Sequence, residues 1–153
     1  MSEREMELEI YRRLKLLPGV AVARQVVVGG RLADLAIVQD DVLTLIECKL
    51  SAVGEAIAQA EGYRRAGDYA LVVMPPRDIT AEMERKFTDY GVGLAFFLPE
   101  CTGPYHVEIQ PRPSERRRIY LRVLAREKRP TTTDARLATE LGIGVSREGG
   151  EAK

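Results

Sequence analysis

The stretch RLADLAIV (31–38), a short polar turn and then VLTLIECK (42–49) decide the fold of this chain. Each half is a run of apolar and β-branched residues, so together they predict two strands joined by a tight turn. Three charged side chains, Asp34, Glu47 and Lys49, interrupt these runs. A charged group inside an apolar strand is costly unless it is paired or binds a cation. We therefore expect these three residues to carry function.

The remainder of the chain supplies the elements around this pair of strands. Residues 3–17 have apolar side chains at helical spacing, and Pro18-Gly19 ends that helix. Residues 20–28 form a strand that turns back at Gly29-Gly30. The later expected elements are a helix over 52–66, a buried strand over 69–74, a helix through 87–90 capped by Asp78 or Thr80, a strand over 94–98 and an edge strand over 105–110. This order predicts an α/β protein with an αβββαβ core, in which helices flank a mixed central sheet.

The charge of the chain is unevenly distributed. The net charge is zero, yet residues 112–129 hold eight basic and two acidic residues, a net of +6. Pro111–Pro113 predicts a boundary between a core domain, 1–110, and a basic helical extension, 111–153. Such a stripe can hold phosphate backbones or can simply be a solvated helix face, and both interpretations stay open. Within it, TTTDARLATELGI (131–143) is similar to part of a helix-turn-helix, but no recognition helix follows.

Several classes of protein are disfavoured by composition. No apolar run reaches the length of a membrane span, and the N-terminus is charged where a secretory signal would be apolar. Cys48 and Cys101 offer neither a disulfide framework nor zinc-ligand spacing. His106 is the single histidine, which leaves little scope for a Ser–His–Asp relay. A cytoplasmic protein without a membrane partner is expected.

The three charged residues have a spacing that suits metal-dependent chemistry. Glu47 and Lys49 are two apart on a strand, so they share one face while Cys48 faces the other. Asp34 lies on the neighbouring strand, across a short turn. Two convergent carboxylates bind Mg²⁺ or Mn²⁺, and an ammonium beside them would orient or deprotonate a water and neutralise a phosphate. The alternative is a buried ion-pair cluster without activity.

These residues resemble the signature of a known nuclease superfamily. Asp34, then twelve residues, then Glu47-Cys48-Lys49 is similar to the PD-(D/E)XK, or restriction-endonuclease-like, pattern, with Ala33 where the name-giving proline would stand. The expected order of elements also resembles the αβββαβ core of that superfamily. Gln59 and Tyr63 resemble a helical Gln-x-x-x-Tyr extension found in several branches. Glu7 is similar to the N-terminal helix glutamate of archaeal Holliday-junction resolvases and Mrr-type enzymes.

The resemblance implies a role for each matched residue. Asp34 and Glu47 would bind Mg²⁺ or Mn²⁺, with the backbone carbonyl of Cys48 as a further ligand. Lys49 would be the catalytic lysine, Glu7 an accessory acid, and Gln59 a residue that positions water or phosphate. The residues expected to contact nucleic acid are Tyr63, Arg64, Arg116, Arg117, Arg118 and Arg122.

The sequence therefore predicts a divalent-metal-dependent endodeoxyribonuclease. Branched DNA is a candidate substrate because of Glu7, and a homodimer is expected because one such site cuts one strand. Two alternatives stay open. The first is a catalytically inactive nuclease-fold module that binds DNA through the basic extension. The second is an assembly protein in which Asp34, Glu47 and Lys49 merely pair, and metal titration and DNA affinity separate the three hypotheses.

Overall fold

A computed structural model of the chain describes residues 1–115. The elements of this part are α1 (Glu3–Lys15), β1 (Ala21–Val28), β2 (Arg31–Gln39), β3 (Val42–Cys48), α2 (Val53–Tyr63), β4 (Tyr69–Met74), α3 (Ala81–Tyr90), β5 (Gly93–Phe96) and β6 (His106–Ile109). This order confirms the predicted α/β class and the αβββαβ succession. The predicted helices of the C-terminal extension lie outside the described residues, and the boundary at 110–111 stays a prediction.

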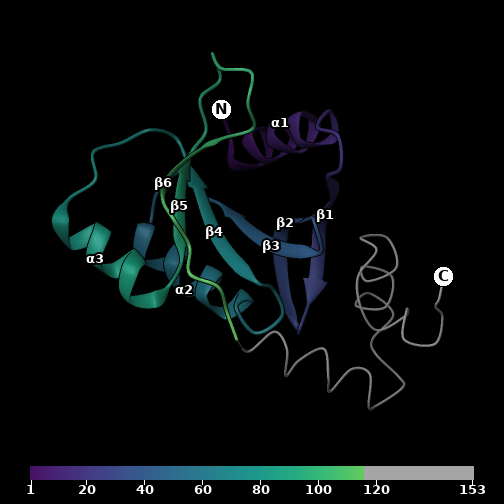
Figure 1. Cartoon of the computed structure of the whole chain (residues 1–153). Helices are drawn as coiled ribbons and strands as arrows, with labels where there is room; N and C mark the ends of the chain where they lie inside the picture. The colour runs from purple at the N-terminus through teal and green to yellow at the C-terminus, as the bar shows by residue number, and fades with distance from the viewer. Residues whose placement is uncertain (116–153) are drawn as a thin grey trace.

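The six strands form one mixed sheet in the order β1-β2-β3-β4-β5-β6. The first three strands are an antiparallel meander, β3, β4 and β5 are parallel, and β6 returns antiparallel to β5. The helices α2 and α3 connect the parallel strands. Because such crossovers are right-handed and each adds a strand on the same side, both helices lie on one face of the sheet. Figure 1 shows α1 covering the opposite face.

Two tight turns fix the register of the meander. Gly29 and Gly30 have φ of 59° and 79°, and Asp40 and Asp41 have φ of 54° and 62°. Positive φ at both central residues is what a two-residue hairpin turn requires, and glycine and aspartate tolerate it best. In the resulting β2–β3 pairing, Leu35 lies opposite Ile46.

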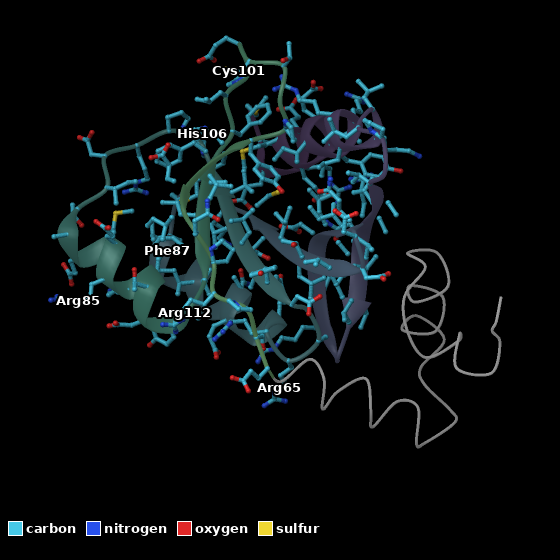
Figure 2. The ribbon with its side chains drawn as sticks, viewed as in Figure 1. Arg65, Arg85, Phe87, Cys101, His106 and Arg112 are labelled. Atoms are coloured by element: carbon cyan, nitrogen blue, oxygen red, sulfur yellow. The ribbon has the colours of Figure 1, made fainter. Side chains whose placement is uncertain are left out.

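The core consists of one apolar cluster on each face of the sheet. On the α1 face, Leu35 and Ile46 are completely buried beside Met6 and Ile10 of the helix. On the other face, Phe87 extends from α3 toward the sheet and is also completely buried (Figure 2). The strand β4 is apolar throughout because both of its faces are covered. The prediction of a two-sided, helix-covered sheet is confirmed.

Several predicted strand limits are wrong by one or two residues. The third strand stops at Cys48 instead of Leu50, because the backbone N–H of Leu50 donates to the Glu3 carboxylate (3.0 Å). The strand expected over 94–98 runs from Gly93 to Phe96. Within residues 1–115, no helix is long and apolar enough to span a membrane.

Candidate active site

The site begins where β2 separates from β3. Their ladder ends at the pair Leu35 and Ile46, and one step further the register places Asp34 opposite Glu47. There the Asp34 carboxylate, through Oδ2, accepts the backbone N–H of Cys48 at 2.8 Å. The Asp34 side chain thus accepts the hydrogen bond that a backbone carbonyl of β2 would accept in a regular ladder. Asp34 and Glu47 therefore follow the end of the ladder at one fork in the sheet, close enough for the charge of Asp34 to raise the pKa of Glu47.

The neighbouring strand β1 is irregular at the same level. Its pairing with β2 includes Arg24 with Leu35 and Val26 with Ala33, but not the intervening residue Gln25, whose φ is 50°. The alternation of side chains changes phase here, so that Ala21 and Ala23 and then Val26 and Val28 all pack toward the α2 side. The break in both strands lets polar side chains converge beside Asp34.

Glu47 is the more deeply buried carboxylate, with 8% of its surface exposed. The hydroxyl of Tyr63 contacts both Glu47 Oε1, at 2.5 Å, and the backbone carbonyl of Leu32, at 2.8 Å. Burial is the main reason that the pKa of Glu47 is raised to about 7; the hydrogen bond with Tyr63 opposes this rise, repulsion from Asp34 adds to it, and the charge of Lys49 opposes it. Because a phenol has one proton to donate, a protonated Glu47 satisfies both contacts at once.

Asp34 is half-buried, and burial likewise raises its pKa above the usual range. Hydrogen bonds from the Cys48 backbone and from Gln25 oppose this rise. Two adjacent carboxylates that both resist ionisation favour a cation between them. This donor set fits Mg²⁺ or Mn²⁺, which prefer oxygen ligands and retain several waters. Among residues 1–115, no three His, Cys, Asp or Glu side chains converge to hold a metal, so water and the Cys48 carbonyl would complete the shell.

Lys49 follows β3 immediately, and its ammonium acts electrostatically on both site carboxylates. Its positive charge lowers the pKa of Asp34 and of Glu47. Its direct partner, however, is Glu55 in the first turn of α2, at 2.7 Å, and this hydrogen bond is the main reason that the pKa of Lys49 is raised. The Glu55 side chain is 61% exposed. The Lys49 side chain is only 16% exposed, but its partner lies toward solvent, so Glu55 can move away and leave Lys49 to another anion.

Glu7 reaches the site through an intermediary. It is buried on α1, as the helical pattern indicates, and pairs with Arg24 Nε at 2.9 Å. Its other oxygen accepts from Gln25 Nε2 at 2.7 Å, and the same nitrogen donates to Asp34 Oδ1 at 3.1 Å. Sequence reasoning missed Arg24 and Gln25. The one available signal is that both are polar in the middle of an apolar strand.

Gln59 lies on α2, one helical turn before Tyr63. Its Oε1 atom is buried and accepts no hydrogen bond from any residue of the described chain. A buried acceptor without a donor is costly unless a water or ligand completes it. Its predicted role in positioning water or phosphate stays a prediction, and this orphaned atom is compatible with it.

The residues expected to contact nucleic acid lie in different environments. Tyr63 is only 3% exposed and belongs to the core, where its hydroxyl contacts Glu47, and this burial disfavours the predicted contact with nucleic acid. Arg64 donates to the carbonyls of Tyr90 (3.1 Å) and Pro113 (3.2 Å) and so fastens the chain that follows β6. The other four arginines, Arg116, Arg117, Arg118 and Arg122, lie outside the described residues.

The residues set aside at first have ordinary surroundings. Cys48 is buried in the α1-side cluster, as expected for a packing residue. Cys101 is exposed in the loop between β5 and β6 (Figure 2). His106 begins the edge strand and lies 3.3 Å from Glu108. Apart from the Cys48 backbone N–H, which donates to Asp34, none of them forms a hydrogen bond or ion pair with the carboxylates of the fork within residues 1–115.

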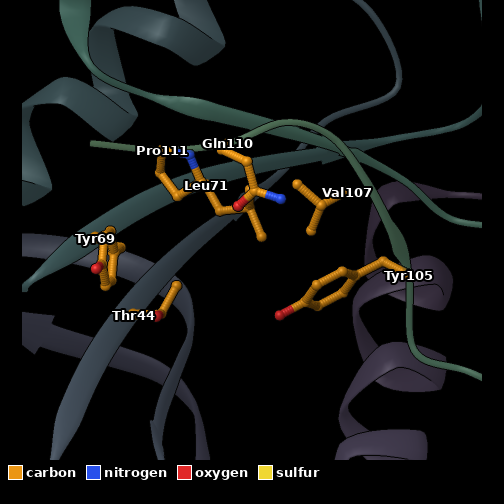
Figure 3. A pocket seen from close by; sticks show the side chains of 7 residues that line it. All are labelled: Thr44, Tyr69, Leu71, Tyr105, Val107, Gln110 and Pro111. Atoms are coloured by element: carbon orange, nitrogen blue, oxygen red, sulfur yellow. The ribbon is translucent and has the colours of Figure 1, made fainter. Parts of the chain in front are cut away.

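A separate groove of about 360 Å³ lies on the sheet beside β6. Figure 3 shows its lining, in which tyrosines and a glutamine are the largest polar groups: Thr44, Tyr69, Leu71, Tyr105, Val107, Gln110 and Pro111. Burial raises the pKa of Tyr105 to about 12, so its hydroxyl stays neutral. The groove has no carboxylate and no cationic side chain in its lining and shares no residue with the fork.

Comparison with known proteins gives little further information. The chain matches no protein family model, and no curated protein is significantly similar to it. Among solved structures, it is similar to that of Pyrococcus furiosus SfsA in complex with Ca²⁺, with a TM-score of 0.38 and 18% sequence identity. The match covers 71% of this chain and 59% of SfsA, so the chain spans less than two thirds of that protein. A likeness this distant supports no functional argument.

Proposed function

We propose that this chain is a divalent-metal-dependent endodeoxyribonuclease of the restriction-endonuclease-like type. The observation that carries the proposal is the fork between β2 and β3. There Asp34 and Glu47 follow the last paired residues of the two strands, the charge of Asp34 acts on Glu47, and the Lys49 ammonium acts on both carboxyl groups. Two carboxylates and an ammonium at a solvent-accessible break in a sheet suit phosphodiester hydrolysis better than they suit packing.

Each residue has a defined task in this proposal. Asp34 and Glu47 would hold Mg²⁺ or Mn²⁺, together with the Cys48 carbonyl, and the ion when bound supplies Lewis-acid activation of the phosphate and of a water. Lys49 would leave Glu55 and neutralise the scissile phosphate or hold the attacking water. Tyr63 fixes the Glu47 carboxyl, and Gln59 offers its free buried oxygen to a water.

The substrate and assembly follow from the same site. The described core offers no separate module that would read base sequence, which favours recognition of DNA backbone and shape. One site cuts one strand, so cleavage of a duplex or a four-way junction would need two copies of the chain. A homodimer is therefore part of the proposal, and light scattering coupled to size-exclusion chromatography tests it with and without DNA.

The central experiment measures cleavage of supercoiled plasmid and of a four-way junction with Mg²⁺ or Mn²⁺. Asp34→Asn and Lys49→Ala are each expected to lower the rate at least about a hundredfold, because each removes a charge that acts on the reacting phosphate. Asp41→Asn, in an exposed turn, and Lys86→Ala, on the exposed side of α3, remove the same charges elsewhere and should leave the rate unchanged.

Circular dichroism and a melting curve show that each variant is folded before its rate is compared. Cleavage that persists in both site variants, or that proceeds equally in EDTA, contradicts the proposed site. Salt-sensitive DNA binding without any metal-dependent cleavage would instead favour the inactive binding module.

A further inference from the structure

Gln25 has an unusual position between two acidic residues. Its single Nε2 nitrogen donates one hydrogen to Glu7 Oε1 (2.7 Å) and the other to Asp34 Oδ1 (3.1 Å). An amide nitrogen has two hydrogens, so this bridge uses its full donor capacity. The amide thereby ties the helix α1 to the carboxylate in the fork of the sheet.

Gln25 makes this bridge from a left-handed backbone conformation, with φ of 50°. That conformation is unfavourable for a residue with a side chain. At this residue the pairing of β1 with β2 is interrupted, so Gln25 and Asp34 are not paired. An unfavourable backbone conformation that survives beside a cluster of charged groups points to a role there.

The bridge also leaves Asp34 with both oxygens held in place. Oδ2 accepts from the Cys48 backbone and Oδ1 accepts from Gln25. Each carboxylate oxygen has a second lone pair, so both remain able to face a cation. Glu7, in contrast, has its charge balanced by Arg24 at 2.9 Å, and it reaches Asp34 through Gln25 alone among the described hydrogen bonds.

We propose that Gln25 is the positioning residue that fixes the Asp34 carboxylate for metal binding, and that Glu7 acts on the site through it. This inference rests on the proposed function, since it concerns the same metal site. Glu7 is then an anchor for the Gln25 amide, with Arg24 holding Glu7 in turn. Positioning groups of this kind typically change metal affinity by about ten- to a hundredfold.

Two substitutions at this one position separate positioning from general stability. Gln25→Ala removes the amide but keeps a side chain at positive φ, whereas Gln25→Gly removes the amide and also relieves the backbone. The affinity for Mn²⁺ is measured from the electron paramagnetic resonance signal of the free ion, and the melting temperature is measured in EDTA. Val27→Ala, at a neighbouring exposed position of β1, is the control.

We expect both Gln25 variants to bind Mn²⁺ about tenfold more weakly than the wild type. We expect Gln25→Gly to melt at a higher temperature than Gln25→Ala, because only glycine adopts positive φ freely. Loss of the amide would then weaken metal binding in both variants, whereas relief of the backbone conformation would raise the melting temperature of the glycine variant alone.

Three results would overturn the inference. Wild-type affinity in Gln25→Gly would show that the amide does not position Asp34. Affinity that falls in step with melting temperature across the variants would show a purely structural role. Absence of Mn²⁺ binding by the wild type would remove the proposed function itself, and that result is recognised without any variant.

Discussion

Replacing Glu47 by glutamine should change how the stability of the protein depends on pH. Burial and the neighbouring Asp34 raise the pKa of Glu47 from 4.5 to about 7 in the folded chain. A carboxyl group with a raised pKa stabilises the fold fully below its unfolded pKa and loses that contribution as pH rises through the folded pKa. The wild type should therefore lose stability between about pH 4.5 and pH 7, and the glutamine variant should lack this component.

The size of the effect follows from the same pKa. Each pKa unit corresponds to about 1.4 kcal/mol, so a rise from 4.5 to about 7 is worth at most about 3.5 kcal/mol. Solvent reaches the fork at Asp34 and screens the charges, which reduces the expected value to about 1–2 kcal/mol. The free energy of unfolding of the wild type, minus that of Glu47→Gln, should fall by this amount from pH 5 to pH 8.

Urea denaturation in EDTA, at pH 5, 6, 7 and 8, measures this difference, and groups that titrate elsewhere cancel in the subtraction. Glutamine retains the size of the side chain and its contact with Tyr63, so the loss of a proton-binding group is the main change. Asp41→Asn, in the exposed turn, provides a control with an unchanged pH profile. A difference that is flat from pH 5 to pH 8, or that increases with pH, would refute the assigned environment of Glu47.

Three further predictions concern stability and metal binding. Mg²⁺ at ten times its dissociation constant should raise the free energy of unfolding by about 1.4 kcal/mol, and a chelator or Asp34→Asn should abolish the increase seen in a melting curve. Arg13→Lys should lower the free energy of unfolding by about 1–3 kcal/mol in urea titrations. The reason is that one guanidinium donates to four backbone carbonyls of the β5–β6 loop, those of Leu98, Pro99, Cys101 and Gly103. A lysine variant as stable as the wild type would contradict this. Leu35→Ala should cost about 2–5 kcal/mol through a cavity under α1, whereas Leu32→Ala, at an exposed position, should cost less than about 1 kcal/mol in the same assay.

The sequence was sufficient for the elements because each depends on local patterns. Alternating apolar residues specify strands and helical spacing specifies α1, while Gly29-Gly30 and Asp40-Asp41 provide the positive φ that tight turns need. Those two turns set the register that brings Asp34 opposite Glu47. The choice of these two residues as the centre of the candidate site was thus available from the sequence.

The partners of the site residues were not available in the same way. For Tyr63 the sequence suggested a contact with nucleic acid, but the packing of α2 on the sheet puts its side chain in the core, with its hydroxyl on Glu47. Lys49 has Glu55 as its direct partner because the first turn of α2 folds back over the end of β3. Such contacts depend on how a helix is placed against a sheet, which no local pattern specifies.

By itself, the amino-acid sequence determined the order of strands and helices, their turns, and the two carboxylates at the centre of the candidate site. Only the tertiary structure decided that Gln25 takes a left-handed conformation and joins Glu7 of α1 to Asp34 of β2. The physical reason is range. Local periodicity and turn chemistry act over a few residues, whereas this bridge needs a helix, an interrupted strand and its neighbour to be in place together.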